Sequence, residues 1–494
     1  MRSLVAALLA LLVLAAPAAA NQRQDSMFMD DNLLLYRGPD RATATLKELK
    51  ELGVDSIRVT LHWHHFAPDA LKGKRPAGEL YYGPKVFDNH DHLLREAREM
   101  GIDVLLNVTG SAPLWATGKE RGKHLNGEFK PNASEFGRFV EVIARRYDGR
   151  HRDENQGERR LPRVDTWSIW NEPNLGSRIQ PQWERGRPAS PAIYRRLVRS
   201  TLAALQRTGH ENDVVLLGET APRGHDTKSR TISMRPGLFL RELFCLDRDL
   251  LPQPQGECDD FEASGRFEVS GFAHHPYSIT SPPDLPHPNP DDITLADRDR
   301  LTRILDAAAG LGRIPPEIPL WYTEYGYQTP PDPYRGVNPD SHARWLVQAE
   351  RITYLDDRVA ALTQFQLIDD PPRTQFRRSD RRYWGTYQSG LKYADGRRKP
   401  AYEAYRLGLD APRQVAPGQS LGLWGFVRAA PNGESQSVQL EVKEPGSQVF
   451  VPVGDPVRVL HERGYFEVAV PARTGDWRFT WNGTASNAVG VYVG

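Results

Sequence analysis

Short apolar runs alternate with amphipathic segments between residues 33 and 405. This alternation is typical of repeated βα units, which build a parallel sheet. Eight runs have the length and character of strands: residues 33–36, 56–61, 104–108, 166–170, 214–217, 269–273, 320–322 and 361–365. Because eight parallel strands close a barrel, the pattern predicts an α/β protein with a (β/α)8 TIM barrel.

The segments between these runs have helical periodicity and clear ends. Leu46, Leu49 and Leu52 share one helical face, and Gly53 follows them as a C-terminal stop. An open, doubly wound sheet is the alternative arrangement of the same units. It is disfavoured because no GxGxxG motif follows the first run to mark a dinucleotide site.

After residue 406 the pattern changes to period two, as in residues 438–442 and 466–470. Half-buried strands at short spacing, with Gly and Pro turns, predict a small all-β sandwich domain. The expected domains are therefore a barrel over residues 21–410 and an accessory β-sandwich over residues 411–494. We expect the second domain to be structural, because its aromatic residues fall mostly in alternating strands where a core would bury them.

The N-terminus resembles a secretory signal peptide. Met1 and Arg2 form a short positive region, an apolar run covers residues 4–16, and Ala20 ends a run of small residues. The apolar run is shorter than the ~20 residues that span a bilayer. We therefore expect cleavage after Ala20, export to the periplasm or the extracellular space, and no membrane span.

Composition and charge narrow the classes of partner. The 494 residues include 64 Lys and Arg against 63 Asp and Glu, which leaves a formal net charge of +1. This balance argues against nucleic acid as a partner, because such binding needs a concentrated basic surface. The only cysteines, Cys245 and Cys258, are predicted to form a disulfide in an exported chain. Two free thiols are the alternative.

Two glutamates follow predicted strands at the end of the barrel that carries catalytic groups. Glu172 follows the fourth run in the segment Trp170-Asn171-Glu172-Pro173, and Glu324 follows the seventh run. The carboxyl ends of barrel strands surround one central pocket, so the two side chains are expected to face each other. Facing carboxyl groups are the pair that hydrolyses glycosidic bonds, one as acid and the other as nucleophile.

This arrangement resembles the (β/α)8 retaining glycoside hydrolases of clan A, cellulase-like families 5 and 39 among them. Such enzymes carry an arginine on strand two, Asn-Glu on strand four, His-x-Tyr on strand six and Glu on strand seven. The matching residues are Arg58, Asn171-Glu172, His275-Pro276-Tyr277 and Glu324. The resemblance covers about residues 30–406 and implies hydrolysis with retention, without a metal or an organic cofactor.

The resemblance also implies a role for each of these residues. Glu172 is expected to be the acid/base, with a raised pKa, and Glu324 the nucleophile. Asn171 is expected to bind the sugar 2-hydroxyl. Tyr277 is expected to donate to Glu324, and Arg58 to keep Glu324 ionised.

One part of the family pattern is missing. Members commonly place a tryptophan at the end of strand eight as a sugar platform, but residues 364–368 read Gln-Phe-Gln-Leu-Ile. The candidates for a replacement aromatic face are Phe365, Trp384, Trp63 and Trp115.

Two other functions remain open on the sequence. His62 and His64, with His274, His275 and Asp369, suggest a metal-dependent TIM-barrel hydrolase that activates water. A barrel that binds carbohydrate without cleaving it is the second alternative. The strand-end glutamates favour the glycoside hydrolase, with a glycoside, oligosaccharide or polysaccharide as substrate.

The sequence leaves the sugar, the linkage, internal or chain-end attack and the oligomeric state undetermined. Loops shape such pockets, and the two long inserts at residues 221–268 and 325–340 are expected to wall the site.

Overall fold

The computed structural model describes residues 23–80, 82–119, 126–157, 159–253, 261 and 264–494. The expected signal peptide, with its cleavage after Ala20, lies outside the described residues and stays a prediction. Cys258 also lies outside them, so its disulfide with the buried Cys245 stays a prediction too. No helix in the described ranges is long and apolar enough to cross a membrane.

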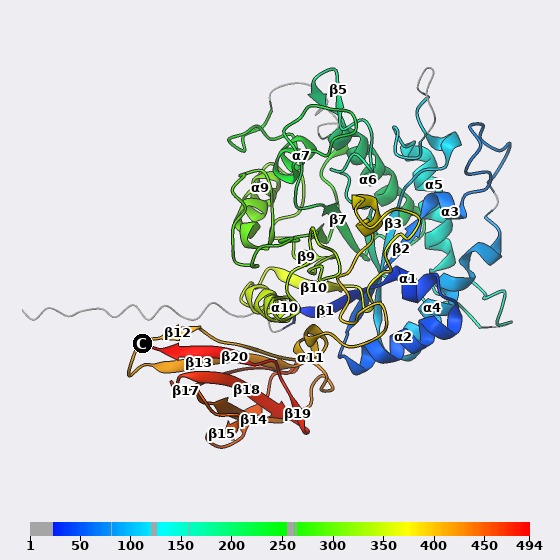
Figure 1. The fold of residues 1–494 in the computed structure, drawn as a ribbon. Helices are drawn as coiled ribbons and strands as arrows, with labels where there is room; N and C mark the ends of the chain where they lie inside the picture. The colour runs from blue at the N-terminus through cyan, green and yellow to red at the C-terminus, as the bar shows by residue number, and fades with distance from the viewer. Residues whose placement is uncertain (1–22, 81, 120–125, 158, 254–260, 262–263) are drawn as a thin grey trace, which may run out of the picture.

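A closed barrel of eight parallel strands forms the larger domain, in the order β1-β10-β9-β8-β7-β4-β3-β2 (Figure 1). The strands are β1 (Asp25–Met29), β2 (Ser56–His62), β3 (Asp103–Thr109), β4 (Thr166–Ile169), β7 (Val214–Thr220), β8 (Gly271–His274), β9 (Leu320–Tyr322) and β10 (Val359–Phe365). The predicted TIM barrel is confirmed, and seven of the eight predicted runs overlap these strands.

The first strand was placed wrongly by the sequence pattern. Residues 33–36 were expected to form it, but β1 is Asp25–Met29 and the leucines lie in the short helix α1 (Asp31–Leu35). The Asp30 side chain accepts a hydrogen bond from the Leu33 backbone N–H at 3.1 Å and so caps this helix. A local N-cap therefore outweighs the strand-like character of a three-leucine run.

Helices surround the barrel on its outside (Figure 1). Pro39 starts α2, whose buried residues Ala42, Leu46 and Leu49 lie at helical spacing. The helices are α2 (Pro39–Glu51), α3 (Trp63–Phe66), α4 (Asp88–Glu99), α5 (Ala133–Arg146), α6 (Ser190–Arg207), α7 (Pro236–Leu243), α9 (Arg298–Gly310), α10 (Pro339–Tyr354) and α11 (Pro400–Arg406). A small hairpin of β5 (Trp183–Glu184) and β6 (Arg187–Pro188) lies in the loop after β4.

An apolar layer fills the inside of the barrel. Met27, Leu105, Leu216, Ala273 and Ala361 come from five strands and are all buried in one cluster. Several of them lie two residues before polar residues at the strand ends. The layer therefore forms a dry floor beneath those polar side chains and lowers the dielectric around them.

The C-terminal domain consists of largely antiparallel sheets, as predicted, with one parallel strand pair at an edge of the larger sheet. One sheet contains β11 (Leu407–Asp410), β13 (Ser420–Val427) and β17 (Tyr465–Pro471). The other contains β12 (Gln414–Val415), β14 (Gln436–Lys443), β15 (Val451–Pro452), β16 (Val457–Val459), β18 (Gly475–Trp481), β19 (Thr484–Ala485) and β20 (Val489–Val493). Apolar residues of both sheets share one core, in which Phe466 meets Phe479 edge to face.

This domain packs against the end of the barrel where the strands begin (Figure 1). Arg463 forms ion pairs with Asp25, the first residue of β1, at 2.7 Å, and with Asp55, just before β2. On α10, Glu350 accepts from the Tyr465 hydroxyl at 2.5 Å and pairs with Arg428 at 2.7 Å. These contacts lie at the barrel end opposite the strand carboxyl ends. Residues at that end usually serve stability rather than catalysis.

The aromatic residues of the C-terminal domain are largely buried, in line with a structural role. Trp424 and Tyr465 stack at 5.7 Å between ring centroids and belong to the same apolar cluster as the barrel. Trp477 is fully buried in the sandwich core, and Trp481 is half-buried.

Candidate active site

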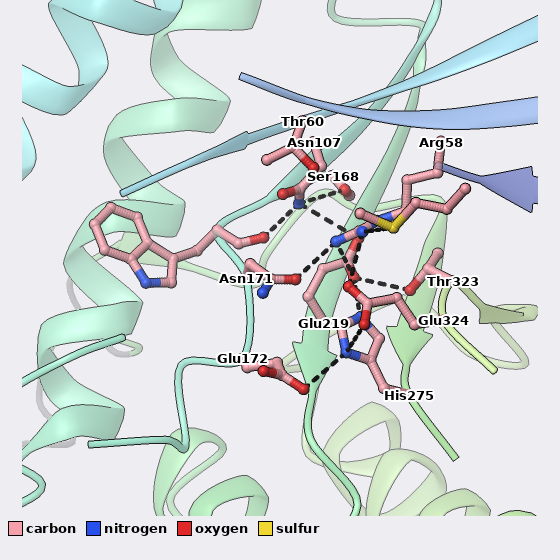
Figure 2. Close-up of polar contacts among 12 residues, drawn as sticks. Arg58, Thr60, Asn107, Ser168, Asn171, Glu172, Glu219, His275, Thr323 and Glu324 are labelled. Carbon is pink, nitrogen blue, oxygen red and sulfur yellow. Dashed lines mark hydrogen bonds and ion pairs between the residues drawn. The ribbon is translucent and has the colours of Figure 1, made fainter. Parts of the chain in front are cut away.

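The functional residues lie at the carboxyl ends of the strands and converge on one point (Figure 2). The set comprises Arg58 on β2, Asn171 and Glu172 after β4, Glu219 on β7, His275 and Tyr277 after β8, and Glu324 after β9. The structure therefore brings together the sequence-predicted residues other than the tryptophans and adds Glu219.

Arg58 is the centre of the network and is fully buried. Its Nη1 donates to Glu324 Oε1 at 3.0 Å and to Met29 Sδ at 2.7 Å. Its Nη2 donates to Asn171 Oδ1 at 2.8 Å and to Glu219 Oε2 at 3.1 Å, and its Nε donates to Glu219 Oε1 at 3.3 Å. One guanidinium thus fixes the relative positions of two carboxylates and one amide.

His275 lies between three carboxylates. Its Nε2 is 2.7 Å from Glu219 Oε2, and its Nδ1 is 3.1 Å from Glu172 Oε1 and 3.6 Å from Glu324 Oε2. Burial alone would lower the pKa of His275, but the negative charges of Glu324 and Glu219 and the hydrogen bonds with Glu172 and Glu219 raise it to about 9. His275 is therefore an imidazolium at neutral pH and donates from both ring nitrogens.

Glu219 is the carboxylate that neutralises the two buried cations. It accepts from Thr323 Oγ1 at 2.8 Å in addition to Arg58 and His275. Burial would raise its pKa, but the charge of Arg58 and the hydrogen bond from His275 lower it to about 2. Glu219 is fully buried and absent from the cavity lining, so its role is to position its neighbours rather than to meet a ligand.

Glu172 and Glu324 face each other across the site. One oxygen of each carboxyl group and one ring nitrogen of His275 lie within 4.8 Å of one another. The Tyr277 hydroxyl donates to Glu324 Oε2 at 3.1 Å, the contact that the resemblance implied. The backbone of Glu172 has φ +47°, a strained conformation of the kind that clusters at functional sites.

The pKa of Glu172 differs from the expectation. Burial raises it, but the hydrogen bond and charge of His275 and the charges of Arg178 and Arg58 outweigh burial and lower it. The raised pKa expected for Glu172 is therefore not found, and the neighbouring group with a raised pKa is His275, whose Nδ1 lies 3.1 Å from Glu172 Oε1. The two groups have to be treated as a coupled pair.

A cavity of about 490 Å³ opens above these residues. Both long inserts contribute to its lining, as expected, through Arg223 in the first and Gln328 and Arg335 in the second. Its volume lies within the range of small-ligand sites.

The expectation that Trp63 and Trp115 contact the substrate is wrong. Trp63 is fully buried and packs on Trp115, Phe136 and Phe139 with ring centroids 5.4–6.2 Å apart. Trp115 donates from Nε1 to the backbone carbonyl of Pro68 at 2.9 Å. Neither tryptophan lines the cavity, because Trp63, in the first turn of α3, packs against α5, and Trp115, in the 3-10 helix at residues 114–116, packs against Trp63.

Phe365 and Tyr387 supply the aromatic lining instead. Their rings meet edge to face with centroids 5.2 Å apart, and both line the cavity. Trp384, the other sequence candidate, donates from Nε1 to a backbone carbonyl at 3.1 Å, is buried and does not line the cavity. The missing strand-eight tryptophan is therefore replaced by a phenylalanine on β10 and a tyrosine from the following loop.

The proposed metal-binding histidines do not assemble into a ligand set. His62 Nδ1 donates to a backbone carbonyl at 2.9 Å, and burial lowers the pKa of His62 to about 4. Both ring nitrogens of His274 are engaged, at 2.9 Å from a carbonyl and 2.8 Å from a threonine hydroxyl. Asp369 pairs with Lys399 at 2.6 Å. His65 packs beside both rings, with its centroid 5.3 Å from that of His62 and 4.0 Å from that of His64, but these histidines do not form a group of gathered ligand atoms among the described residues. The side chains whose ligand atoms do gather, within 4.8 Å of one another, are Glu172, His275 and Glu324.

Sequence reasoning missed Glu219. The signal was present, because Glu219 follows the predicted fifth strand just as Glu172 follows the fourth. Glycoside hydrolysis needs only two carboxyl groups, so the expected mechanism gave no reason for a third.

No family model matches the chain, and no curated protein matches it. Among solved structures, it is similar to the GH5_18 protein of Streptomyces cattleya in complex with GlcNAc, at 16% identity and a TM-score of 0.47, over 80% of this chain and 85% of that one. It is also similar to a β-glucosidase from Exiguobacterium marinum, at 16% identity and a TM-score of 0.45, over 78% and 92%. A β-glucosidase from Thermotoga maritima in complex with castanospermine matches at 14% identity and a TM-score of 0.42, over 74% and 84%.

Glu219→Gln tests whether the buried carboxylate holds the network together. The change leaves Arg58 and His275 short of a negative charge, so we expect a loss of about 3–5 kcal/mol in the free energy of unfolding at pH 7. Because the folded-state pKa of Glu219 is depressed to about 2, its stabilisation is present above about pH 4.5 and is lost as the pH falls toward 2. Urea unfolding at pH 7 and pH 3 measures this loss. The difference in the free energy of unfolding between wild type and variant should be smaller at pH 3 than at pH 7.

Glu141→Gln is the matched control. Glu141 pairs with Arg207 on the surface, where an ion pair contributes about 0–1 kcal/mol. Equal effects of the two substitutions at pH 7 would contradict the role given to Glu219.

Proposed function

We propose that this protein is a secreted retaining glycoside hydrolase that cleaves an O-glycosidic bond by double displacement. The observation that carries the proposal is the approach of the Glu172 and Glu324 carboxyl groups, of which one oxygen each lies within 4.8 Å of the other. Carboxyl groups about 5–5.5 Å apart allow direct attack on the anomeric carbon, whereas inverting enzymes keep about 6.5–9.5 Å for a water. Export is inferred from the N-terminal sequence alone.

In the first step, Glu324 attacks the anomeric carbon and the bond to the leaving oxygen breaks. Arg58 and Tyr277 hold the Glu324 carboxylate through its two oxygens and orient it for this attack. Glu172 delivers a proton to the leaving oxygen and takes one from His275 Nδ1, 3.1 Å from its Oε1. Attack itself favours this transfer, because forming the glycosyl ester removes the Glu324 charge that raises the pKa of His275.

In the second step, water attacks the same carbon and the bond to Glu324 breaks. Glu172 now accepts the proton of the water and passes it to His275, whose pKa rises again as the Glu324 carboxylate is restored. Asn171, held by Arg58 at 2.8 Å, is placed to bind the sugar 2-hydroxyl. Phe365 and Tyr387 supply the apolar face for the sugar ring.

A non-catalytic carbohydrate-binding barrel is the remaining alternative. It accounts for the cavity and its aromatic lining but gives no reason for three carboxylates around one buried imidazolium. The kinetic experiments below separate the two functions.

Replacing either glutamate should affect turnover in a different way. Glu324→Gln should reduce kcat on every substrate by at least about 10⁴-fold, because no glycosyl ester forms. Glu172→Ala should spare aryl glycosides with good leaving groups, and added azide should restore part of its rate by replacing activated water. Steady-state kinetics on a panel of aryl glycosides and polysaccharides, with proton NMR of the first product anomer, tests this. An inverted first product would contradict the role of Glu324.

The pH profile should reveal the proton held by His275. Its folded-state pKa of about 9 lies above the ordinary value, so the proton is present at neutral pH and is lost as the pH rises through 9. We expect kcat/KM to fall above pH 9 for substrates with poor leaving groups and less for those with good ones, which need little proton donation. His275→Gln should abolish this basic limb. If kcat/KM of that variant still falls above pH 9, a group other than His275 causes the fall.

A further inference from the structure

Three arginines line the cavity, and the buried Arg58 is not part of its lining. Arg178 follows β4, Arg223 follows β7, and Arg335 lies in the loop after β9. They come from three separate walls of the cavity, and the last two lie in the long inserts. Phe365 and Tyr387 close the cavity on the β10 side.

These arginines are poorly paired within the protein. The nearest carboxylate oxygen to Arg178 Nε is that of Glu172 at 3.9 Å, beyond hydrogen-bond distance. The Nε atoms of Arg178 and Arg223 are buried and donate no hydrogen bond to any described residue. Arg223 makes one long contact, from Nη2 to the Ser278 carbonyl at 3.4 Å, and Arg335 forms no ion pair within the described ranges.

Nearby arginines outside the cavity behave differently. Arg235 pairs with Asp226 and Asp292, both at 2.6 Å, and Arg241 pairs with Asp291 at 2.6 Å. Arg235 and Arg241 thus have close carboxylate partners, unlike the three arginines of the cavity lining.

The catalytic carboxylates do not need these charges. The three carboxylates are balanced by Arg58, His275 and, at longer range, Arg178. A further cavity carboxyl, Asp31, has its pKa raised to about 7 by burial, so it is only partly ionised at neutral pH. The charges of Arg223 and Arg335 are thus in excess of those of the cavity carboxylates. Arg223 is half-buried, and a partly buried guanidinium without a partner is costly unless a ligand supplies one, whereas Arg335 is exposed and free to pair with a ligand.

We propose that the cavity binds a glycan carrying an anionic substituent, a carboxylate or a sulfate ester, which Arg223 and Arg335 receive together with Arg178. The proposal rests on the proposed glycosidase function for its site but concerns the charge of the substrate. A guanidinium presents a planar fork of donors that matches these oxyanions in bidentate geometry. Arg178 Nε lies 3.9 Å from Glu172 Oε2, so an anion held by Arg178 lies beside the proposed acid/base.

Binding and turnover test the proposal separately. Binding is measured by calorimetry on the full-length Glu324→Gln protein, with neutral, uronate and sulfated oligosaccharides of the same backbone sugars. At least one anionic series should bind about tenfold or more tightly than its neutral counterpart, with an affinity that weakens as salt is added. The uronate and sulfated arms distinguish the two sources of the anion. If no anionic oligosaccharide binds more tightly than its neutral counterpart, the proposal is wrong.

Turnover uses matched aryl glycosides, such as a glucoside with its glucuronide and a galactoside with its galacturonide. Arg223→Gln and Arg335→Gln should each lower kcat/KM for the anionic member about tenfold more than for the neutral member. Arg458→Gln, an exposed change in the C-terminal domain, is the control and should leave the ratio unchanged. Equal losses on both members would contradict the proposal while leaving the glycosidase function intact. If nothing is cleaved, the glycosidase proposal fails. The calorimetric comparison of anionic and neutral oligosaccharides still decides whether the cavity binds an anionic glycan.

Discussion

The buried guanidinium of Arg58 is the constraint on which the site depends. A cation with no solvent exposure is stable only when acceptors surround it, and Arg58 has Glu219, Glu324 and Asn171 at 2.8–3.3 Å. These acceptors come from three different strand ends, so satisfying Arg58 aligns β4, β7 and β9 around one point. The charge of Glu219 that Arg58 requires also raises the pKa of His275, which in the proposed mechanism holds the proton for Glu172. In that mechanism, one buried charge network sets both the position of the nucleophile and the supply of the proton.

The two ends of the barrel have separate tasks. At the end where the strands begin, Arg463 and the stacked pair Trp424 and Tyr465 attach the β-sandwich to the barrel. At the other end, the loops after β4, β7 and β9 bring arginines over the network. In the proposed function, the residues at the cavity floor break the bond and the loops select the substrate.

Much of the barrel could be predicted from the sequence, because parallel strands buried on both faces read as short apolar runs. The exception, residues 33–36, shows the limit of that reading, since the N-cap at Asp30 turns a strand-like run into a helix. Glu172 and Glu324 were recognisable from their places after strands. The burial of Trp63 and the loop contribution of Tyr387 were not, because strand-end position does not tell whether a side chain points inward or between helices.

The central claim is that Glu324 forms a covalent bond with the sugar, and trapping that intermediate tests it most directly. A 2-deoxy-2-fluoro glycosyl fluoride of the sugar that is cleaved fastest should inactivate the enzyme. The fluorine at C2 slows both formation and breakdown of the glycosyl-enzyme, but the good leaving group at C1 speeds formation only, so the intermediate accumulates. Peptide mass spectrometry of the inactivated protein should then find one sugar per chain on the peptide that contains Glu324, and none in Glu324→Gln. A label on another residue, or steady turnover without labelling, would contradict the account.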